Sequence, residues 1–569
     1  MSQASLFGDE PFTTPAADAR GDGLSDPAGL ANAAPGGTED DVPPFEYWAT
    51  PVEAGRTLVE ASAGTGKTFA IAGLVLRLVL DGDWLATTPG GLPDLRRLLV
   101  VTFTKAATEE LRTRIRRALR VALAVARDES IPETSPLAGD LPLVDPLRPL
   151  LGRSEAEGRL LAALDRVDEA GVFTIHSFCQ RVLKQAAFES GTPFEMEFVE
   201  DSDSDALRSR AAADAWACLT HGDPLLAALA VSRGRTPDVL IQHHKNTADF
   251  PSVRILPDTP SLVEAQARLG EAMGTLAATW SAEAVRDALA EVEWNKSAPL
   301  DGPEAAALLA RVGAFARGED LDALPAVETC TTEAIYKAGK KTSQARKDAL
   351  DAASKATPFR ACTEVVEAVG ALDQAFIREF VLEVGRRIEA IKERRGQLTF
   401  NDLITRLHAA LHSDDAGPTL AAGIRRQFAV ALIDEFQDTD PLQYGIFRTA
   451  FEGHPLYFVG DPKQAIYAFR GADVHAYLGA QQEATRRYTL GTNWRSTAGL
   501  VEAVNRIFER PARAFLFDGI PFRRVASAPH HAESALLDGD LPPLVWWPMP
   551  ARGDKVPGKG EASDLIPPL

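Results

Sequence analysis

The residues best suited to chemistry stand in the segment from Leu58 to Thr68, LVEASAGTGKT. A short apolar stretch runs into a glycine-rich turn, and a lysine and a hydroxyl follow where a helix would begin. Gly64 and Gly66 would let backbone N–H groups approach phosphate oxygens closely. Lys67 would reach the β- and γ-phosphates, and the Thr68 hydroxyl would ligate Mg²⁺. The segment therefore predicts a phosphate cradle that binds ATP and Mg²⁺.

The expected cradle contains one departure from the general pattern GxxxxGK[ST], because Ala61 stands where the first glycine would be. Taken alone, the segment is also compatible with an ordinary glycine-rich turn between a strand and a helix. The residues expected to line the cradle are Ala61, Ser62, Ala63, Gly64, Thr65, Gly66, Lys67 and Thr68.

A second chemical element lies far downstream, where the apolar run Ala429 to Ile433 ends in Asp434 and Glu435. Two carboxylates at the end of a buried strand suit a metal-and-water site. Asp434 would hold Mg²⁺ together with Thr68, and Glu435 would orient or deprotonate the attacking water. The alternative is a strand that ends in a solvated acidic turn, and the phosphate cradle favours the metal site.

Composition limits the class of protein. With 569 residues, 45% of them hydrophobic, the chain is long enough for several domains. The net charge of −20 argues against nucleic-acid binding through overall positive charge, although a local basic track can coexist with it. The four cysteines show no CxxC pairing, which indicates a reducing compartment. No stretch reaches the roughly 18 apolar residues of a membrane span, so we expect a cytoplasmic protein without membrane contact.

Hydrophobic patterning predicts an α/β fold. Short apolar strands alternate with amphipathic helices in TLVEA with a helix after Lys67, RLLVVTF with a helix from Ala106, and VFTIH with a helix from Phe178. This alternation is typical of a parallel sheet. Residues 207 to 395 carry apolar residues at helical spacing, and strands then resume in AVALI, LYFVG and RYTL. The sheet is therefore expected to be assembled from both sides of a mostly helical insertion.

Several further strings make the prediction specific: VTFTKAATEEL, VFTIHSFCQRVL, VGDPKQAIYAFRGAD and LGTNWRS. In order and spacing they resemble the motifs of UvrD/Rep-type superfamily 1 helicases. The strings LVEASAGTGKT and RGQLTFNDLITRLHAAL are most similar to those of the RecB-type subunits of RecBCD helicase–nucleases. The resemblance covers residues 50 to about 530 and implies P-loop motor domains of the RecA-like type.

Composition, hydrophobic spacing and this resemblance together predict a domain order along the chain. Residues 1–45, rich in Ala, Pro, Gly and Asp, form a disordered acidic leader. Residues 46–206 and 396–490 form the first RecA-like domain, and 207–395 form the helical insertion. Residues 491–569 form the start of a second RecA-like domain that is truncated.

The resemblance also implies roles for particular residues. Gln464, in the same element as Asp461, would sense the γ-phosphate. Arg495 would reach the γ-phosphate from the second domain, while Trp494 stacks on adenine. With Lys67, Asp434 and Glu435, Gln464 and Arg495 complete the expected catalytic set. The residues expected along single-stranded DNA are Thr104, His176, Ser177, Tyr467, Phe469 and Arg470.

Some of these residues have ordinary structural alternatives. Taken alone, Tyr467 and Phe469 fit core packing beside a strand, and His176 fits a hydrogen-bonded core histidine. Two basic clusters fit solvated helix faces as well as phosphate contacts, and neither is assigned as a site. They are Arg112, Arg114, Arg116, Arg117 and Arg120, and Lys337, Lys340, Lys341, Arg346 and Lys347.

Taken together, the resemblance implies an ATP-dependent 3′-to-5′ DNA helicase acting in double-strand-break repair, with RecC-like and RecD-like partners. The alternatives are a stand-alone UvrD-type helicase and a non-catalytic, nucleotide-gated DNA-binding or assembly module. Glu53 and Ala54 stand near the place of an adenine-reading glutamine, so preference for ATP over other nucleotides stays open. No later helicase motif or nuclease follows Ser496, so we expect the N-terminal half of a longer subunit with weak hydrolysis on its own.

Overall fold

The computed structural model describes residues 42–88, 90–192, 197–199, 201–248, 254–295, 298–301, 304–466, 473–511, 514–529 and 544. From Pro43 onward the chain forms one compact unit. Residues 1–41 of the leader expected over residues 1–45 lie outside the described residues. Phe45 is already buried, and its N–H donates to the carbonyl oxygen of Thr489 (2.8 Å). The packed chain thus begins slightly before residue 46.

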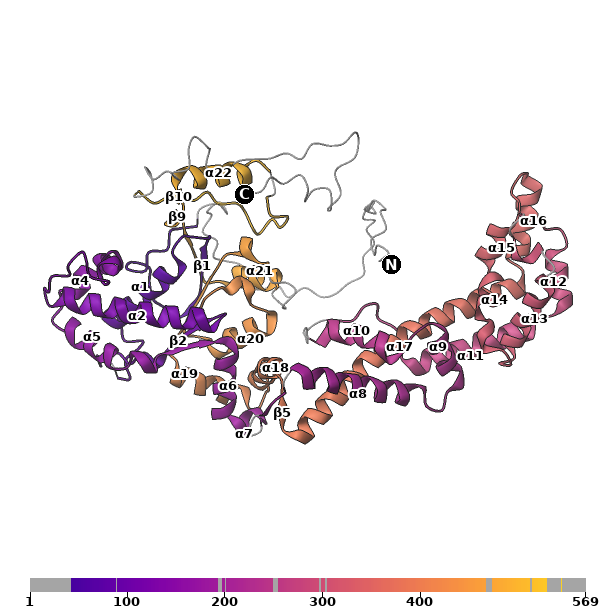
Figure 1. The fold of residues 1–569 in the computed structure, drawn as a ribbon, viewed down its shortest axis with the longest axis horizontal. Helices are drawn as coiled ribbons and strands as arrows, with labels where there is room; N and C mark the ends of the chain where they lie inside the picture. The colour runs from indigo at the N-terminus through magenta and orange to yellow at the C-terminus, as the bar shows by residue number, and fades with distance from the viewer. Residues whose placement is uncertain are drawn as a thin grey trace, which may run out of the picture. The chain divides into compact units, whose positions relative to one another are not determined.

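A six-stranded parallel sheet organises this unit (Figure 1). Its strands are β1 (Gly55–Ala61), β2 (Leu98–Thr102), β3 (Gly171–Thr174), β6 (Val430–Ile433), β7 (Pro455–Gly460) and β8 (Arg486–Leu490). The spatial order is β3-β2-β6-β7-β1-β8, and every neighbouring pair is parallel. Because β6 lies between β2 and β7, strands from both sides of the long helical segment share one sheet. The α/β prediction is confirmed.

Helices cover both faces of the sheet, which explains the continuous apolar runs of its strands. Along β2, Leu98 and Val100 join the core that includes α1 (Lys67–Leu80), α2 (Lys105–Ala126) and α5 (Ala156–Asp165). Leu99 and Val101 point to the opposite core. The helices of that second face are α6 (Ile175–Gln185), α18 (Phe400–Leu411), α19 (Gly417–Gln427) and α20 (Pro441–Ala450).

The third strand is shorter than its sequence suggests. The prediction extended it through His176 and began the helix at Phe178, but β3 ends at Thr174 and α6 begins at Ile175. The reason is a helix cap, because the Thr174 hydroxyl accepts the N–H of Ser177 (3.3 Å) and satisfies one free donor of the first turn. His176 therefore lies on a helix and not at a strand end.

Ten helices follow between Asp201 and Arg395, with gaps in the described chain at 249–253, 296–297 and 302–303. They are α8 (Asp201–Thr220), α9 (Pro224–Ser232), α10 (Pro237–Ala248), α11 (Leu262–Thr279), α12 (Ala282–Leu289), α13 (Ala305–Ala316), α14 (Leu324–Thr329), α15 (Thr332–Ala338), α16 (Gln344–Ser354) and α17 (Thr357–Arg395). The 39-residue α17 packs along α8 and α11 (Figure 1). These helices enclose an apolar core of their own that includes Leu269, Phe315 and Phe376.

The chain returns to the sheet domain through a short connection. Gly396, with φ of 66°, ends α17 in the left-handed conformation that glycine tolerates best. Next, β5 (Gln397–Leu398) pairs with β4 (Glu197–Phe198) in parallel, so both ends of the helical segment meet at one small ladder.

Beyond β8, the described residues form β9 (Thr492–Asn493), α22 (Ala498–Glu509) and β10 (Ala526–Ser527), with β9 and β10 parallel. Short 3₁₀ turns follow two of the strands, Phe436–Asp438 after β6 and Pro462–Gln464 after β7. The helix α21 (Val474–Glu483) precedes β8. Among the described residues, no helix is both long and apolar enough to pass through a lipid bilayer.

Candidate nucleotide site and nucleic-acid path

The glycine-rich turn connects β1 to α1 at the carboxyl edge of the sheet. Gly64 and Gly66 adopt φ angles of 75° and 87°, a left-handed region that favours glycine. A Cβ atom on Gly64 would lie 3.0 Å from Asn493 Nδ2 and 3.0 Å from Arg495 Cβ. Glycine is therefore needed at position 64 both for the backbone conformation and for the close approach of the β9 segment.

Local hydrogen bonds hold the turn in shape. The backbone N–H and the hydroxyl of Thr65 both donate to the carbonyl oxygen of Ser62, at 3.2 and 2.7 Å. Ala61, in contrast, is fully buried in the core at the end of β1. Its methyl group therefore packs inward, and any contribution of Ala61 to a phosphate would come from its backbone.

The turn and the acidic pair meet through a direct ion pair between Lys67 Nζ and Glu435 Oε2. The same carboxylate oxygen accepts a hydrogen bond from Gln437 Nε2 at 2.7 Å. Glu435 has φ of 51°, an uncommon conformation for a residue with a side chain. The fold thus brings together two elements that are 368 positions apart in the chain.

Asp434 lies deeper than its neighbour. Burial and the negative charge of Glu435 raise the pKa of Asp434 to about 7, while the positive charge of Lys67 opposes the shift. A partly buried carboxylate that holds a proton near neutral pH is favoured in its charged form by a cation. This environment fits the hard, oxygen-seeking Mg²⁺, with Asp434 and the partly buried Thr68 hydroxyl as the side chains that would hold it.

Asp438 was not predicted as a site residue, although it lies in the same DEFQD string. Burial and the charge of Glu435 raise its pKa to about 6. Its Oδ1 atom is buried and has no hydrogen-bond partner among the described residues. Such an unpaired polar atom suits a site that takes up a polar or charged occupant.

The turn after β7 contributes the next side chains. Gln464 Nε2 donates to Asp461 Oδ2 at 2.7 Å. The backbone N–H of Asp461 donates to Oε1 of Gln437 at 2.9 Å. Gln437 therefore joins the candidate γ-phosphate element to Glu435, a link that the sequence did not reveal.

Residues of the NWRS string lie directly on the glycine-rich turn. The N–H of Trp494 donates to the carbonyl oxygen of Gly64 (2.8 Å), and Asn493 Nδ2 donates to that of Ala63 (3.1 Å). Asn493 Oδ1 in turn accepts the N–H groups of Arg495 (2.9 Å) and Ser496 (2.8 Å). Asn493 thus connects the glycine-rich turn to the NWRS segment through its side-chain amide. In the sequence, only its place in the NWRS motif pointed to this role.

The predicted DNA contacts fall in two groups. Thr104 is exposed at the start of α2, where its hydroxyl accepts the N–H of Ala107 (3.1 Å). The hydroxyls of Ser177 and Thr174 are 2.9 Å apart, at the start of α6. Burial lowers the pKa of His176, so its ring is neutral at physiological pH. Tyr467, Phe469 and Arg470 lie outside the described residues.

An exposed aromatic side chain beside His176 was missed by the sequence reading. Phe400, at the start of α18, is 61% exposed, and its ring centroid lies 6.0 Å from that of His176 in an edge-on arrangement. It also stacks on Phe198 at 5.0 Å. The available signal in the sequence was the phenylalanine of the RGQLTFNDLITRLHAAL string.

The two basic clusters noted in the sequence are largely paired within the protein. Arg117 bonds to Asp140 (2.9 Å), and Arg116 pairs with Asp168. Arg346 bonds to Glu293 (2.8 Å) in the helical segment. These pairs favour the reading of both clusters as ordinary surface charge.

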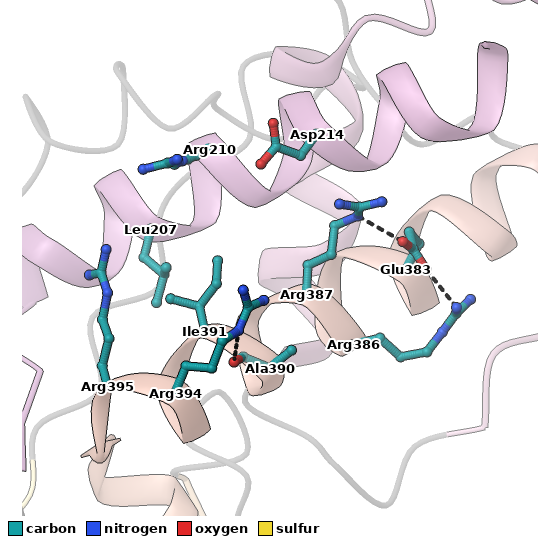
Figure 2. A pocket seen from close by; sticks show the side chains of 10 residues that line it. All are labelled: Leu207, Arg210, Asp214, Glu383, Arg386, Arg387, Ala390, Ile391, Arg394 and Arg395. Carbon is teal, nitrogen blue, oxygen red and sulfur yellow. Dashed lines mark hydrogen bonds and ion pairs between the residues drawn. The ribbon is translucent and has the colours of Figure 1, made fainter.

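A third basic feature emerges only from the fold. A groove of about 620 Å³ between α8 and α17 is lined by five arginines, Arg210, Arg386, Arg387, Arg394 and Arg395. Figure 2 shows Arg386 and Arg387 bonded to Glu383, and Arg394 bonded to the Ala390 carbonyl. Arg210 and Arg395 are exposed and have no charged partner in the described part of the chain. Only the fold shows that Arg210 of α8 joins the four arginines of α17.

The fold and the site define a class of protein. A model of the UvrD/REP helicase N-terminal domain family matches residues 46–485. The chain therefore belongs to this helicase family, and the resemblance seen in its motifs is confirmed.

Individual relatives are more specific. The RecBCD enzyme subunit RecB of Escherichia coli (strain K12) is 38% identical over 489 residues, covering 83% of this chain and 39% of that protein. The RecB subunit of Haemophilus influenzae is 31% identical over 528 residues, covering 86% of this chain and 42% of its own length. That of Mycolicibacterium smegmatis is 30% identical over 452 residues, covering 79% and 29%. The chain spans about two fifths of the length of the first two relatives.

Proposed function

We propose that this chain is the ATP-binding motor part of a RecB-like DNA helicase that moves 3′ to 5′ in double-strand-break repair and recombination. The observation that carries the proposal is the Lys67–Glu435 ion pair, which joins the phosphate turn to the acidic pair at one edge of the sheet. In this proposal residues 46–206 and 396–490 form the first RecA-like domain. Residues 207–395 form its insertion, and 491–569 begin the second domain.

The roles of the chain's own residues follow from their positions. Lys67 and the turn's N–H groups would bind phosphate oxygens, and Asp434 with Thr68 would hold Mg²⁺. When bound, Mg²⁺ neutralises charge that develops on the phosphates. Glu435, held by Gln437, would orient the attacking water and accept its proton.

Closure around the nucleotide involves the second segment. The backbone of Trp494 already bonds to Gly64, so the Arg495 side chain is carried on a segment fixed to the turn. Arginine suits a charged phosphate because its planar fork gives two parallel hydrogen bonds. Gln464 would sense the same γ-phosphate from the first domain, and Trp494, which is 53% exposed, would stack on adenine.

For nucleic acid, we propose a path that includes Thr104, His176 and Ser177, with Phe400 as an added stacking surface. Tyr467, Phe469 and Arg470 are proposed for the same path from the family motif. The arginine groove between α8 and α17 offers further phosphate contacts for the strand. By analogy with the RecBCD subunit names of its relatives, partners of the RecC and RecD kind are proposed for the full-length protein.

The first experiment is steady-state ATPase activity of the purified chain with and without single-stranded DNA, with Glu435→Gln as the control. DNA-stimulated turnover that is lost in the variant supports the motor. If the chain binds ATP but turns it over only at the rate of the variant, the non-catalytic, nucleotide-gated DNA-binding module is the better description. Failure to bind ATP at all refutes the proposal.

The groove is tested separately by DNA binding. Replacing Arg210, Arg394 and Arg395 with alanine should weaken binding and reduce the slope of log affinity against log salt by about one unit per lost phosphate contact. Arg268→Ala is the matched control, because Arg268 is exposed on α11 outside the groove. Equal salt slopes for the triple variant and the control would remove the groove from the DNA path.

A further inference from the structure

Two carboxylates lie buried side by side behind the phosphate turn. Glu60 precedes Ala61 at the end of β1 and pairs in register with Gly460 of β7, so it stands beside Asp461. Only 6% of Glu60 and 2% of Asp461 are exposed. Buried carboxylates at such proximity repel each other unless a cation lies between them.

Lys463 supplies that cation. Its Nζ lies 2.5 Å from Glu60 Oε1 and 2.7 Å from Asp461 Oδ1. Burial opposes the positive charge, but the two carboxylates outweigh it and raise the pKa of Lys463. The ammonium group is therefore charged throughout the physiological range, and two of its three N–H donors are directed at these carboxylates.

Asp461 carries this contact to the candidate γ-phosphate sensor. Its Oδ1 faces Lys463, and its Oδ2 accepts the hydrogen bond from Gln464 Nε2. A side-chain amide has two N–H donors, so the second N–H of Gln464 stays available to donate to a phosphate oxygen. The orientation of the amide thus depends on a carboxylate that Lys463 holds in place.

Glu60 extends the network in the other direction. Its Oε2 lies 3.5 Å from Nε of Arg523, a residue of the segment that follows α22. The four charges of Asp461, Lys463, Glu60 and Arg523 sum to zero. The buried part of this network, Glu60, Asp461 and Lys463, has few alternative arrangements because its charges are paired, and the Glu60–Arg523 ion pair connects it to the segment after α22.

We propose that Lys463 is a positioning residue. Through Asp461 it orients the amide of Gln464 for γ-phosphate recognition, and through Glu60 it links Gln464 to the segment that contains Arg523. Lys463 is a positioning residue and not a catalytic one, because its ammonium contacts the two carboxylates and acts on the nucleotide only through them. The inference rests on the proposed function, since Gln464 needs a γ-phosphate to recognise.

The test compares the affinities of the full chain for Mg²⁺·ADP and for Mg²⁺·AMP-PNP, a non-hydrolysable analogue that carries the third phosphate. Lys463→Met should weaken AMP-PNP binding about tenfold and leave ADP binding within about twofold, the size expected when one charged hydrogen bond is lost. Lys463→Arg, which keeps the charge, should retain most of the difference. Gln464→Ala should match Lys463→Met, and the double variant should lose nothing further.

The outcomes separate the inference from the function on which it rests. If neither nucleotide binds to the unaltered chain, the proposed function itself fails. If both bind and Lys463→Met keeps the AMP-PNP preference that Gln464→Ala loses, the positioning role is refuted. Should Lys463→Met not fold, Glu60→Gln preserves the shape and removes one charge. A loss confined to AMP-PNP, about threefold, then supports the inference, and an equal loss for both nucleotides overturns it.

Discussion

The ion pair between Lys392 and Asp402 is predicted to fasten the helical segment to the sheet domain. Lys392 is 3% exposed near the end of α17, and its Nζ lies 2.7 and 2.8 Å from the two carboxylate oxygens of Asp402 in α18. Replacing Lys392 with methionine keeps the volume but leaves the buried carboxylate without its cation. Removing one partner of a buried pair costs about 3–5 kcal/mol.

The lower end of that range is expected here. The N–H of Thr399 still donates to Asp402 Oδ2 at 2.6 Å, which keeps one oxygen satisfied. The further pair of Lys392 with the half-exposed Glu389 adds little. We therefore expect Lys392→Met to lower the free energy of unfolding by about 3 kcal/mol.

Urea unfolding followed by tryptophan fluorescence measures this change. Lys355→Met is the matched control, because Lys355 is 65% exposed and its pair with Asp351 should matter little. Combining Lys392→Met with Asp402→Leu should recover much of the loss. A deficit of about 1 kcal/mol should remain because Asp402 also belongs to the cap of α18. If Lys392→Met unfolds at the same urea concentration as Lys355→Met, the reasoning about the buried pair is wrong.

Three further predictions concern the site. The raised pKa of Asp434, about 7, keeps this carboxyl group protonated at lower pH. Mg²⁺-dependent nucleotide affinity, measured by titration calorimetry, should therefore increase from about pH 6 to about pH 8. The Asp434→Asn variant should show no such rise. Gly64→Ala should weaken nucleotide binding about tenfold or more, because its Cβ would meet Asn493 at 3.0 Å and φ is 75°; an unchanged dissociation constant would contradict the close approach. Phe400→Ala should weaken single-stranded DNA binding by about 1–3 kcal/mol in fluorescence anisotropy, and equal affinity would exclude stacking there.

Much of the fold was readable from the sequence because local rules and burial agree. The strands around Leu98 and Val430 are short apolar runs, and such runs suit a parallel sheet covered on both faces. The phosphate turn was predictable for a related reason. It needs positive φ angles at positions 64 and 66, and glycine is the residue type that adopts them most easily. The boundary of β3 was misplaced because an apolar run does not show where the Thr174 cap ends the strand.

The sequence by itself determined the alternation of strands and helices, the phosphate turn and the acidic pair, because each depends on residues adjacent in the chain. The tertiary structure alone decided the contacts through which distant groups meet. Lys67 reaches Glu435, Asn493 bridges to the turn, and Lys463 joins two buried carboxylates. The physical reason is that strand order and register place these side chains together, and neither is encoded in local spacing.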